Sequence, residues 1–489
     1  MGRGWRALTS LLLAAAFAVL AVPLGLNLAR AVEWPQAGPQ PVISTPSAQQ
    51  EPRALSAAPL LAPDRPAAPA VDAKALDKAL DGALEYDGEG DVTAIVTEAS
   101  TGKVVYDRGG SEPRIPASNM KLLTAAAALS TMGADTRFST EVVRGSSPGA
   151  VVLRGGGDAL LGAGESRPGE VRGRAGLKTL AAAAAKQIDM GEYSGDLSVQ
   201  LDDSLFAGPA ISPAWAPEDV QAGEIGPVHA LALNGGRERA DGTGAYAADP
   251  ALAAAAAFRD ALADAVADRG IEVAPDVVRG RATEQAPVLA AVESATVAAQ
   301  ANYLLLHSDN YVAEVMARNL ALASGKPGSF GGGTEAIKEA LGQLEIPMDG
   351  LLITDASGLS LGDRVSAAQI AAVVREITNG ENPDLRAALD GLPVAGLNGT
   401  LSQRFTGEAA AGAGLVRAKT GTLNAVTSLG GYAVSPEGHM FVFAFVANGL
   451  QGPAEPAREA LDRAAAVLAA AAAGKDARRG MVHRWANGR

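Results

Sequence analysis

The chain of 489 residues contains no cysteine. This absence excludes a disulfide framework, a thiolate nucleophile, an iron–sulfur cluster and a lipid-modified cysteine. Basic residues are also in deficit, because 41 Lys and Arg stand against 54 Asp and Glu, and the formal net charge of −13 argues against nucleic acid as a partner. The four histidines lack metal-ligand spacing, and no metal or cofactor is expected.

Apolar residues make up 48% of the chain, which is enough for a large core and excludes a disordered protein. At the N-terminus, Arg3 and Arg6 precede an uncharged span over residues 7–29, a pattern typical of an export signal. The span is also nearly long enough for an uncleaved membrane anchor. Residues 1–31 are therefore expected to be a signal peptide or anchor, with the rest secreted or held at the outer face of the cytoplasmic membrane.

The next segment, residues 32–72, is rich in Pro, Ala, Gln and Ser, which predicts an extended linker. Beyond it, the pattern predicts a helix over 74–84 and a hairpin over 91–109. Helices are expected over 311–325, 332–344 and 364–377, strands over 414–426, 427–435 and 439–449, and a closing helix over 456–474, before a basic tail at 475–489. The interval 141–281 alternates strand-like pieces with glycine-rich turns and carries one clear helix over 249–270, which indicates an inserted, mostly-β region.

Ser118 and Lys121 stand three residues apart before an alanine-rich run, so on a helix the amine would lie one turn from the hydroxyl. The simpler interpretation of this stretch is that Ser118 caps a helix. A second copy of the spacing, residues 100–103, lies between two strand-like runs and is interpreted as a hairpin turn. The spacing alone therefore does not decide between a helix start and a nucleophile.

Two further triplets decide in favour of the nucleophile. Ser308-Asp309-Asn310 opens a helical run and Lys419-Thr420-Gly421 lies in a strand-like run. In this order, the three motifs match the signature of the penicillin-recognising serine enzymes. The chain resembles more narrowly the low-molecular-mass class C penicillin-binding proteins, which are D-alanyl-D-alanine carboxypeptidases that also act as endopeptidases. This resemblance runs from about residue 75 to 468 and rests on the blocks IPASNMKL, LRGGGDALL, DDSLFAGPAISPAWAPED, LLLHSDNYVAEVMAR, DASGLSLGDRVSA, LPVAGLNGTLSQRF and RAKTGTLNAVTSLGGY.

The resemblance implies that Ser118 attacks the substrate carbonyl and forms an acyl-enzyme. Lys121 would be the base, provided that burial or a neighbouring cation lowers its pKa, and Lys419 is the expected cation. Ser308 would pass a proton to the leaving nitrogen. Asn310 would orient Lys121 and the substrate amide.

The same resemblance assigns substrate binding to the strand-like run. Lys419 and Thr420 would hold the terminal carboxylate of the substrate. Gly421 would let the substrate backbone lie alongside the strand. The backbone N–H groups of Ser118 and Thr422 would face the developing oxyanion.

The implied fold is α/β (α+β), the penicillin-binding and β-lactamase-like transpeptidase fold, with an antiparallel sheet flanked by helices. Its catalytic domain would comprise residues 73–140 and 282–472 around the insert. Peptidoglycan stem peptides are the implied substrates and β-lactams the implied covalent inhibitors. Ala356 and Leu361 depart from the Gly and Arg frequent in the family, which affects only the local turn and nearby subsites.

Two alternatives stay open. A serine β-lactamase would share the motifs, although the chain shows neither a Glu-x-x-Leu-Asn segment nor Tyr-x-Asn. A catalytically silent, wall-tethered binding protein would explain the linker and the insert. Residues 145–149 fit an esterase elbow, but Pro148 cannot supply its backbone N–H. His229 and Asp203 are interpreted as structural, and His307 is the histidine to watch because it precedes Ser308.

Overall fold

The computed structural model describes residues 72–188 and 197–471, all within one unit that covers residues 68–489. The predicted export segment (1–31), the basic tail (475–489) and all but the last residue of the predicted linker lie outside the described residues. In the part of the chain that is described, no helix is long and apolar enough to cross a membrane.

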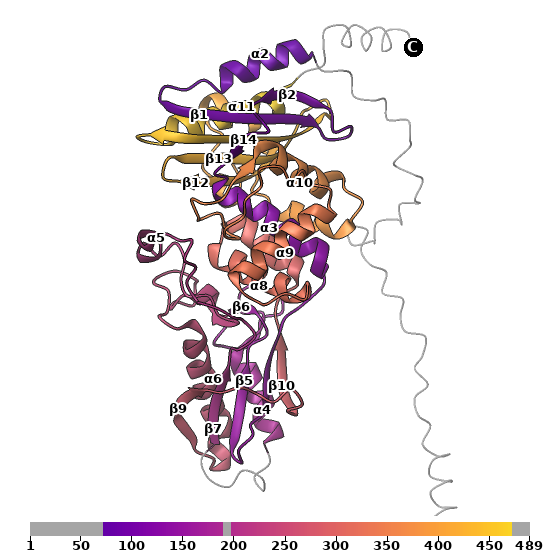
Figure 1. The fold of residues 1–489 in the computed structure, drawn as a ribbon. Coiled ribbons are helices and arrows are strands. Elements are labelled where there is room, and N and C mark those ends of the chain that lie inside the picture. The colour runs from indigo at the N-terminus through magenta and orange to yellow at the C-terminus, as the bar shows by residue number, and fades with distance from the viewer. Residues whose placement is uncertain (1–71, 189–196, 472–489) are drawn as a thin grey trace, which may run out of the picture. The chain divides into compact units, whose positions relative to one another are not determined.

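The central sheet has five antiparallel strands that come from the two ends of the described chain (Figure 1). The first strand in the chain pairs with the last one, with Ile95 opposite Ala444. This pairing joins the N-terminal hairpin to the C-terminal strands. The predicted hairpin and the three predicted C-terminal strands are all present. Their order across the sheet is β12 (Val416–Leu423), β13 (Val426–Val434), β14 (Met440–Gln451), β1 (Glu89–Glu98) and β2 (Val104–Arg108).

Helices cover both faces of this sheet. On one face, α2 (Ala73–Ala83) and α11 (Glu455–Ala469) share a hydrophobic cluster with the strands. On the other face, α10 (Ala367–Asn379) packs against β1, β13 and β14. Because both faces are covered, eight of the nine residues of β13 are buried. The prediction of an antiparallel sheet flanked by helices is confirmed.

A helical layer surrounds α3 (Met120–Met132), which begins two residues after Ser118 and packs against α10. Its neighbours are α7 (Val297–His307), α8 (Asn310–Ala323) and α9 (Phe330–Gln343). The first ten residues of α3 are all buried, because its run of small alanine side chains allows helices to approach from several sides. This packing places the start of α3 and the junction between α7 and α8 close together. A two-stranded pair, β3 (Pro113–Arg114) and β11 (Val365–Ser366), lies beside this layer.

The inserted region forms a second five-stranded sheet covered by α4 (Leu177–Gln187) and α6 (Pro250–Val266). Three of its strands pair in parallel, which requires crossover connections and explains why helices accompany the strands. The predicted helix over 249–270 corresponds to α6, whereas α4 was not predicted. The sheet also extends beyond the predicted range of 141–281. Its strand order is β10 (Val288–Glu293), β4 (Ser139–Arg144), β5 (Ala150–Arg154), β7 (Leu197–Asp202) and β9 (Val273–Arg279).

Shorter elements of the inserted region contact the helical layer. β6 (Asp158–Leu161) pairs with β8 (Leu231–Leu233), and β6 packs against α8. The short helix α5 (Pro217–Gln221) follows Trp215, which is 5% exposed and belongs to a cluster that includes Tyr311 of α8. The inserted region is therefore joined to the helical layer by buried side chains.

Candidate active site

Ser118 lies in a short 3₁₀ turn (Ala117–Asn119) that leads into α3. Ala117 has a φ of 48°, in the left-handed region that alanine rarely adopts, so the surrounding structure must hold this turn. A Cβ at Gly358 would lie 2.0 Å from the carbonyl oxygen of Ala117, and a Cβ at Gly421 would lie 2.9 Å from that of Pro116. Both glycines are therefore required by the close approach of this turn. Gly421 was predicted to leave room for the substrate backbone. The structure gives a different reason for a glycine at this position, which is that a side chain would clash with the turn.

Lys121, in the first turn of α3, is fully buried and has three hydrogen-bond acceptors. Its Nζ lies 2.9 Å from Ser118 Oγ, 2.6 Å from Asn310 Oδ1 and 2.7 Å from the carbonyl oxygen of Ser357. An ammonium would donate to all three. A neutral amine has two N–H donors and one lone pair, so it can donate to Asn310 and Ser357 and accept the proton of Ser118. The helix-cap alternative is not supported, because the N-cap of α3 is Asn119.

Burial is the main cause of the low pKa of Lys121. It lowers the pKa to about 8, against the opposing charges of Asp355 and Asp309. The pKa of Lys419 is also lowered, by burial first and then by the charge of Lys121. We expected Lys419 to lower the pKa of Lys121, but the main cause in the structure is burial. The consequence for chemistry is that an appreciable fraction of Lys121 is a neutral amine near neutral pH.

The second motif lies where α7 ends and α8 begins. Ser308 caps α7 with a φ of 57°, Asp309 caps α8 by accepting from the N–H of Val312, and Asn310 is the first residue of α8. This tight reversal directs two adjacent side chains toward two different lysines. Ser308 Oγ accepts from Lys419 Nζ at 2.8 Å, while Asn310 accepts from Lys121. The strained conformation of Ser308 is of the kind that is retained at functional sites.

The third motif lies on β12, the strand at the edge of the central sheet next to Ser118. Lys419 is fully buried and also donates to the carbonyl oxygen of Thr420 at 2.7 Å. The hydroxyl of Thr420 donates to that of Thr400 at 2.8 Å. Thr422 is exposed at the end of the strand. The structure therefore joins Lys121, Ser118 and Asn310 in one hydrogen-bonded group and Ser308 and Lys419 in another.

Sequence reasoning missed two buried carboxyl groups that support Lys121. Glu314 Oε1, on α8, accepts from the N–H groups of Ala356 and Ser357 at 3.0 and 2.9 Å. Asp355 accepts from the N–H of Gly358 at 2.7 Å and from Trp215 Nε1 at 3.0 Å. Together they hold the loop whose Ser357 carbonyl accepts from Lys121. The available signal was Glu314 itself, a charged residue one turn after Asn310 in a largely apolar helix.

Glu314→Gln is expected to leave acylation and folding nearly unchanged at neutral pH. Burial, followed by the charge of Asp355, raises the pKa of Glu314 well above its usual range, so the native group is protonated and glutamine resembles it. In the parent, stability is greatest below the usual glutamate pKa and falls as pH rises toward the raised one, because the unfolded chain ionises first. In urea unfolding measured from pH 5 to 8, the decline should be smaller in the glutamine variant than in the parent, because only other buried acids such as Asp158 still contribute to it.

Glu314→Ala is the matched comparison, because it leaves two buried N–H groups unsatisfied and should cost about 1–3 kcal/mol per group. An equal decline of stability with pH in the parent and in Glu314→Gln would contradict the assignment.

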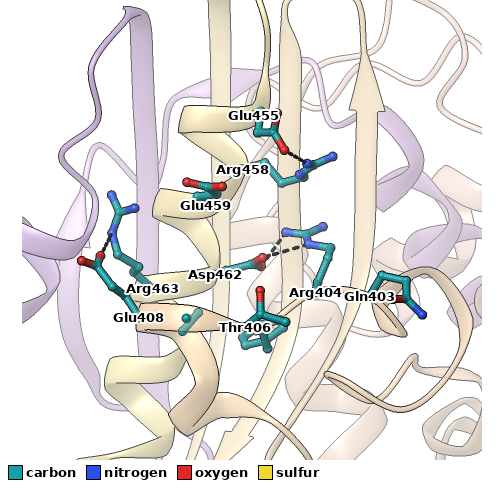
Figure 2. A pocket seen from close by; sticks show the side chains of 12 residues that line it. Gln403, Arg404, Thr406, Glu408, Glu455, Arg458, Glu459, Asp462 and Arg463 are labelled. Carbon is teal, nitrogen blue, oxygen red and sulfur yellow. Dashed lines mark hydrogen bonds and ion pairs between the residues drawn. The ribbon is translucent and has the colours of Figure 1, made fainter.

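A separate cavity of about 300 Å³ lies between residues 403–409 and α11 (Figure 2). Its wall contains the ion pair of Arg404 and Asp462, which joins Nη2 to Oδ1 at 2.6 Å. No residue of the three motifs lines it, so it is not the site of the predicted chemistry. Among residues 72–188 and 197–471, no group of three or more potential metal ligands occurs.

Comparison with known proteins gives one matching family. The model of the D-Ala-D-Ala carboxypeptidase 3 (S13) family matches residues 74–249 and 243–471. The protein of Mycolicibacterium smegmatis named carboxypeptidase DacB is 35% identical over 410 residues, 82% of this chain and 85% of that protein. The D-alanyl-D-alanine carboxypeptidase of an Actinomadura species is 30% identical over 462 residues, 78% of this chain and 81% of that protein.

Solved structures give the same fold. Penicillin-binding protein 4 from Haemophilus influenzae superposes with a TM-score of 0.63 at 20% identity, covering 81% of this chain and 98% of that one. A second structure of the same protein, in complex with a β-lactam, superposes with a TM-score of 0.58 at 21% identity, with the same coverage. The predicted penicillin-binding fold is confirmed by these superpositions.

Proposed function

The chain belongs to the D-Ala-D-Ala carboxypeptidase 3 (S13) family, and from this premise we propose that Ser118 is the nucleophile with which it removes the terminal D-alanine from peptidoglycan stem peptides. The enzyme is a hydrolase, a serine-type peptidase. The observation that carries the proposal is the buried Lys121 amine, which lies 2.9 Å from Ser118 Oγ while Asn310 and Ser357 occupy its two other bonding directions.

In acylation, neutral Lys121 takes the proton of Ser118 as Oγ attacks the carbonyl carbon of the D-Ala–D-Ala peptide bond. The tetrahedral intermediate collapses as the C–N bond breaks. The proton that Lys121 took from Ser118 is passed through Ser308, whose hydroxyl is hydrogen-bonded to Lys419, to the leaving nitrogen, and this transfer returns Lys121 to its neutral form. D-Alanine departs, leaving an ester on Ser118. Lys121 then takes a proton from a water molecule as that water attacks the ester, and it returns the proton to Ser118 Oγ as the ester bond breaks.

Substrate binding is assigned to β12. Lys419 and Thr420 would hold the terminal carboxylate, a charge-assisted contact that suits a free D-alanine end. The N–H groups of Ser118 and Thr422 would stabilise the oxyanion, a contribution typically worth about 3–4 kcal/mol per donor in acyl transfer.

Endopeptidase action and export are part of the same proposal. Cleavage of a cross-link differs from carboxypeptidase action in the group that carries the leaving amine, so the same acyl-enzyme serves both. β-Lactams would acylate Ser118, as suggested by the complex of the Haemophilus influenzae protein with such a compound. The N-terminal pattern of residues 1–31 would place the enzyme outside the cytoplasm, as a secreted or membrane-anchored protein.

Digestion of purified stem peptides and cross-linked muropeptides, followed by mass spectrometry, tests the proposal, with Ser118→Ala as the inactive control. Release of D-alanine that depends on Ser118 is the expected result. Rapid hydrolysis of nitrocefin without release of D-alanine would favour a β-lactamase. Absence of any covalent adduct with labelled penicillin would favour a silent binding protein.

A further inference from the structure

The second motif is held from the inserted region as well as from the helical layer. Asn310 Nδ2 donates to the carbonyl oxygen of Glu224 at 2.9 Å, while its Oδ1 accepts from Lys121 at 2.6 Å. The next residue, Tyr311, is fully buried. Its hydroxyl donates to the carbonyl oxygen of Pro227 at 2.9 Å and accepts from the N–H of His229 at 3.3 Å. Residues 224–229, named here the brace segment, therefore fix the amide of Asn310 and the ring beside it.

The brace segment is in turn fixed by an ion cluster in the inserted region. His229 Nδ1 lies 3.1 Å from Asp203 Oδ2, and Arg279 Nη2 lies 3.0 Å from the same oxygen. Arg279 also pairs with Asp249 at 2.8 Å. Asp203 follows β7, Arg279 ends β9 and Asp249 caps α6, so the cluster ties the brace segment to the second sheet.

The carboxylate of Asp203 keeps its negative charge well below neutral pH. Burial alone would raise the pKa of Asp203, but the hydrogen bonds from His229 and Arg279 outweigh it and lower the pKa to about 2. The groups facing His229 are the two carboxylates, Asp203 and Asp249, and behind them the Arg279 guanidinium. A carboxylate that remains ionised keeps His229, and with it the brace segment, in place.

We propose that the inserted region sets the rate of acylation by positioning Asn310 through the brace segment, with His229 and Arg279 as positioning residues. An amide side chain has two distinct ends, and the Glu224 carbonyl accepts only from the nitrogen end. It therefore holds the oxygen end toward Lys121. A brace segment that shifts would release this constraint, and Lys121 would lose the alignment with Ser118 that proton transfer needs. This inference rests on the proposed function of Ser118 and Lys121.

Arg279→Gln tests the proposal at a residue whose side chain is 44% exposed and whose hydrogen bonds and ion pairs are made with Asp203 and Asp249. The matched control is Arg239→Gln, which removes another ion pair of the inserted region, with Asp241 at 3.3 Å, from a side chain that is 69% exposed. Second-order acylation by labelled penicillin should fall about tenfold in Arg279→Gln, as expected for misaligned reacting groups, and less than about twofold in Arg239→Gln. His229→Ala should resemble Arg279→Gln. His229→Asn should recover part of the loss, because its amide nitrogen can replace Nδ1.

A double-mutant cycle separates positioning from general destabilisation. In the background of Asn310→Ala, Arg279→Gln should cause no further loss of acylation, because its effect passes through Asn310. Thermal unfolding measured alongside shows that each variant is folded at the assay temperature. Full acylation in Arg279→Gln, or losses that add in the double variant, would overturn the inference. A parent enzyme that never acylates would instead overturn the proposed function.

Discussion

Lys121→Met is expected to slow acylation of Ser118 by about 10²–10⁴-fold, the range typical of losing a general base. Methionine fills nearly the same volume as lysine in a fully buried position, so the fold should survive. The amine that can accept the Ser118 proton at 2.9 Å is lost. Formation of a covalent adduct with labelled penicillin, followed by intact-protein mass spectrometry over time, measures the effect.

The chain supplies its own control. Lys103→Met alters the second serine-x-x-lysine spacing, residues 100–103, whose lysine is exposed beside the turn of the first hairpin. It should acylate at the parent rate. Acylation by the parent should also rise about tenfold per pH unit below the Lys121 pKa of about 8 and level off above it, because only the neutral amine is a base. Near-parent acylation in Lys121→Met would show that another group is the base.

The local parts of this structure were accessible from sequence because their signals are local. The hairpin over 91–109 has two strand-like apolar runs around a glycine-containing turn, and the three motifs are short patterns whose residue types follow from the chemistry. The helix α6 was predicted as a clear helical run with Gly270 as its stop. α4 was missed, because its run of alanines provides only a weak apolar period.

The support around the motifs depends on contacts between distant segments, which no local pattern encodes. Trp215 of the inserted region donates to Asp355, 140 residues away, and Asn448 of β14 accepts from the N–H of Ile115, 333 residues away. The pairing of β1 with β14 is of the same kind. Electrostatic causes cannot be predicted from sequence either, because the burial that lowers the pKa of Lys121 arises only when α8 and the loop of Ser357 pack against it. Sequence therefore predicted the reacting groups, whereas the structure shows which contacts surround and hold them.

Lys419→Gln is expected to reduce turnover of a substrate with a free terminal carboxylate by an order of magnitude or more, since a charge-assisted contact is worth about 1.5–3 kcal/mol. A substrate whose terminus is an amide should lose less, because it offers no carboxylate to the cation. Steady-state kinetics on the paired acid and amide peptides measures the difference. The acid limb of acylation should stay near pH 8 in the variant, because burial is the main cause of the lowered Lys121 pKa.

The lowered pKa of Lys419 gives substrate binding a pH dependence opposite to that of acylation: binding weakens as pH rises, whereas acylation becomes faster. In the free enzyme, burial and the charge of Lys121 favour the neutral amine of Lys419, which has two N–H groups for its two acceptors, Ser308 and Thr420. A bound carboxylate favours the ammonium, so binding of the acid peptide takes up a proton. Its KM should rise with pH above the lowered pKa of Lys419, while the KM of the amide should not, and Lys419→Gln should abolish this difference. Equal losses of turnover on the acid and the amide peptide would refute carboxylate binding by Lys419. A shift of the acid limb of acylation in Lys419→Gln would show that Lys419 does lower the pKa of Lys121.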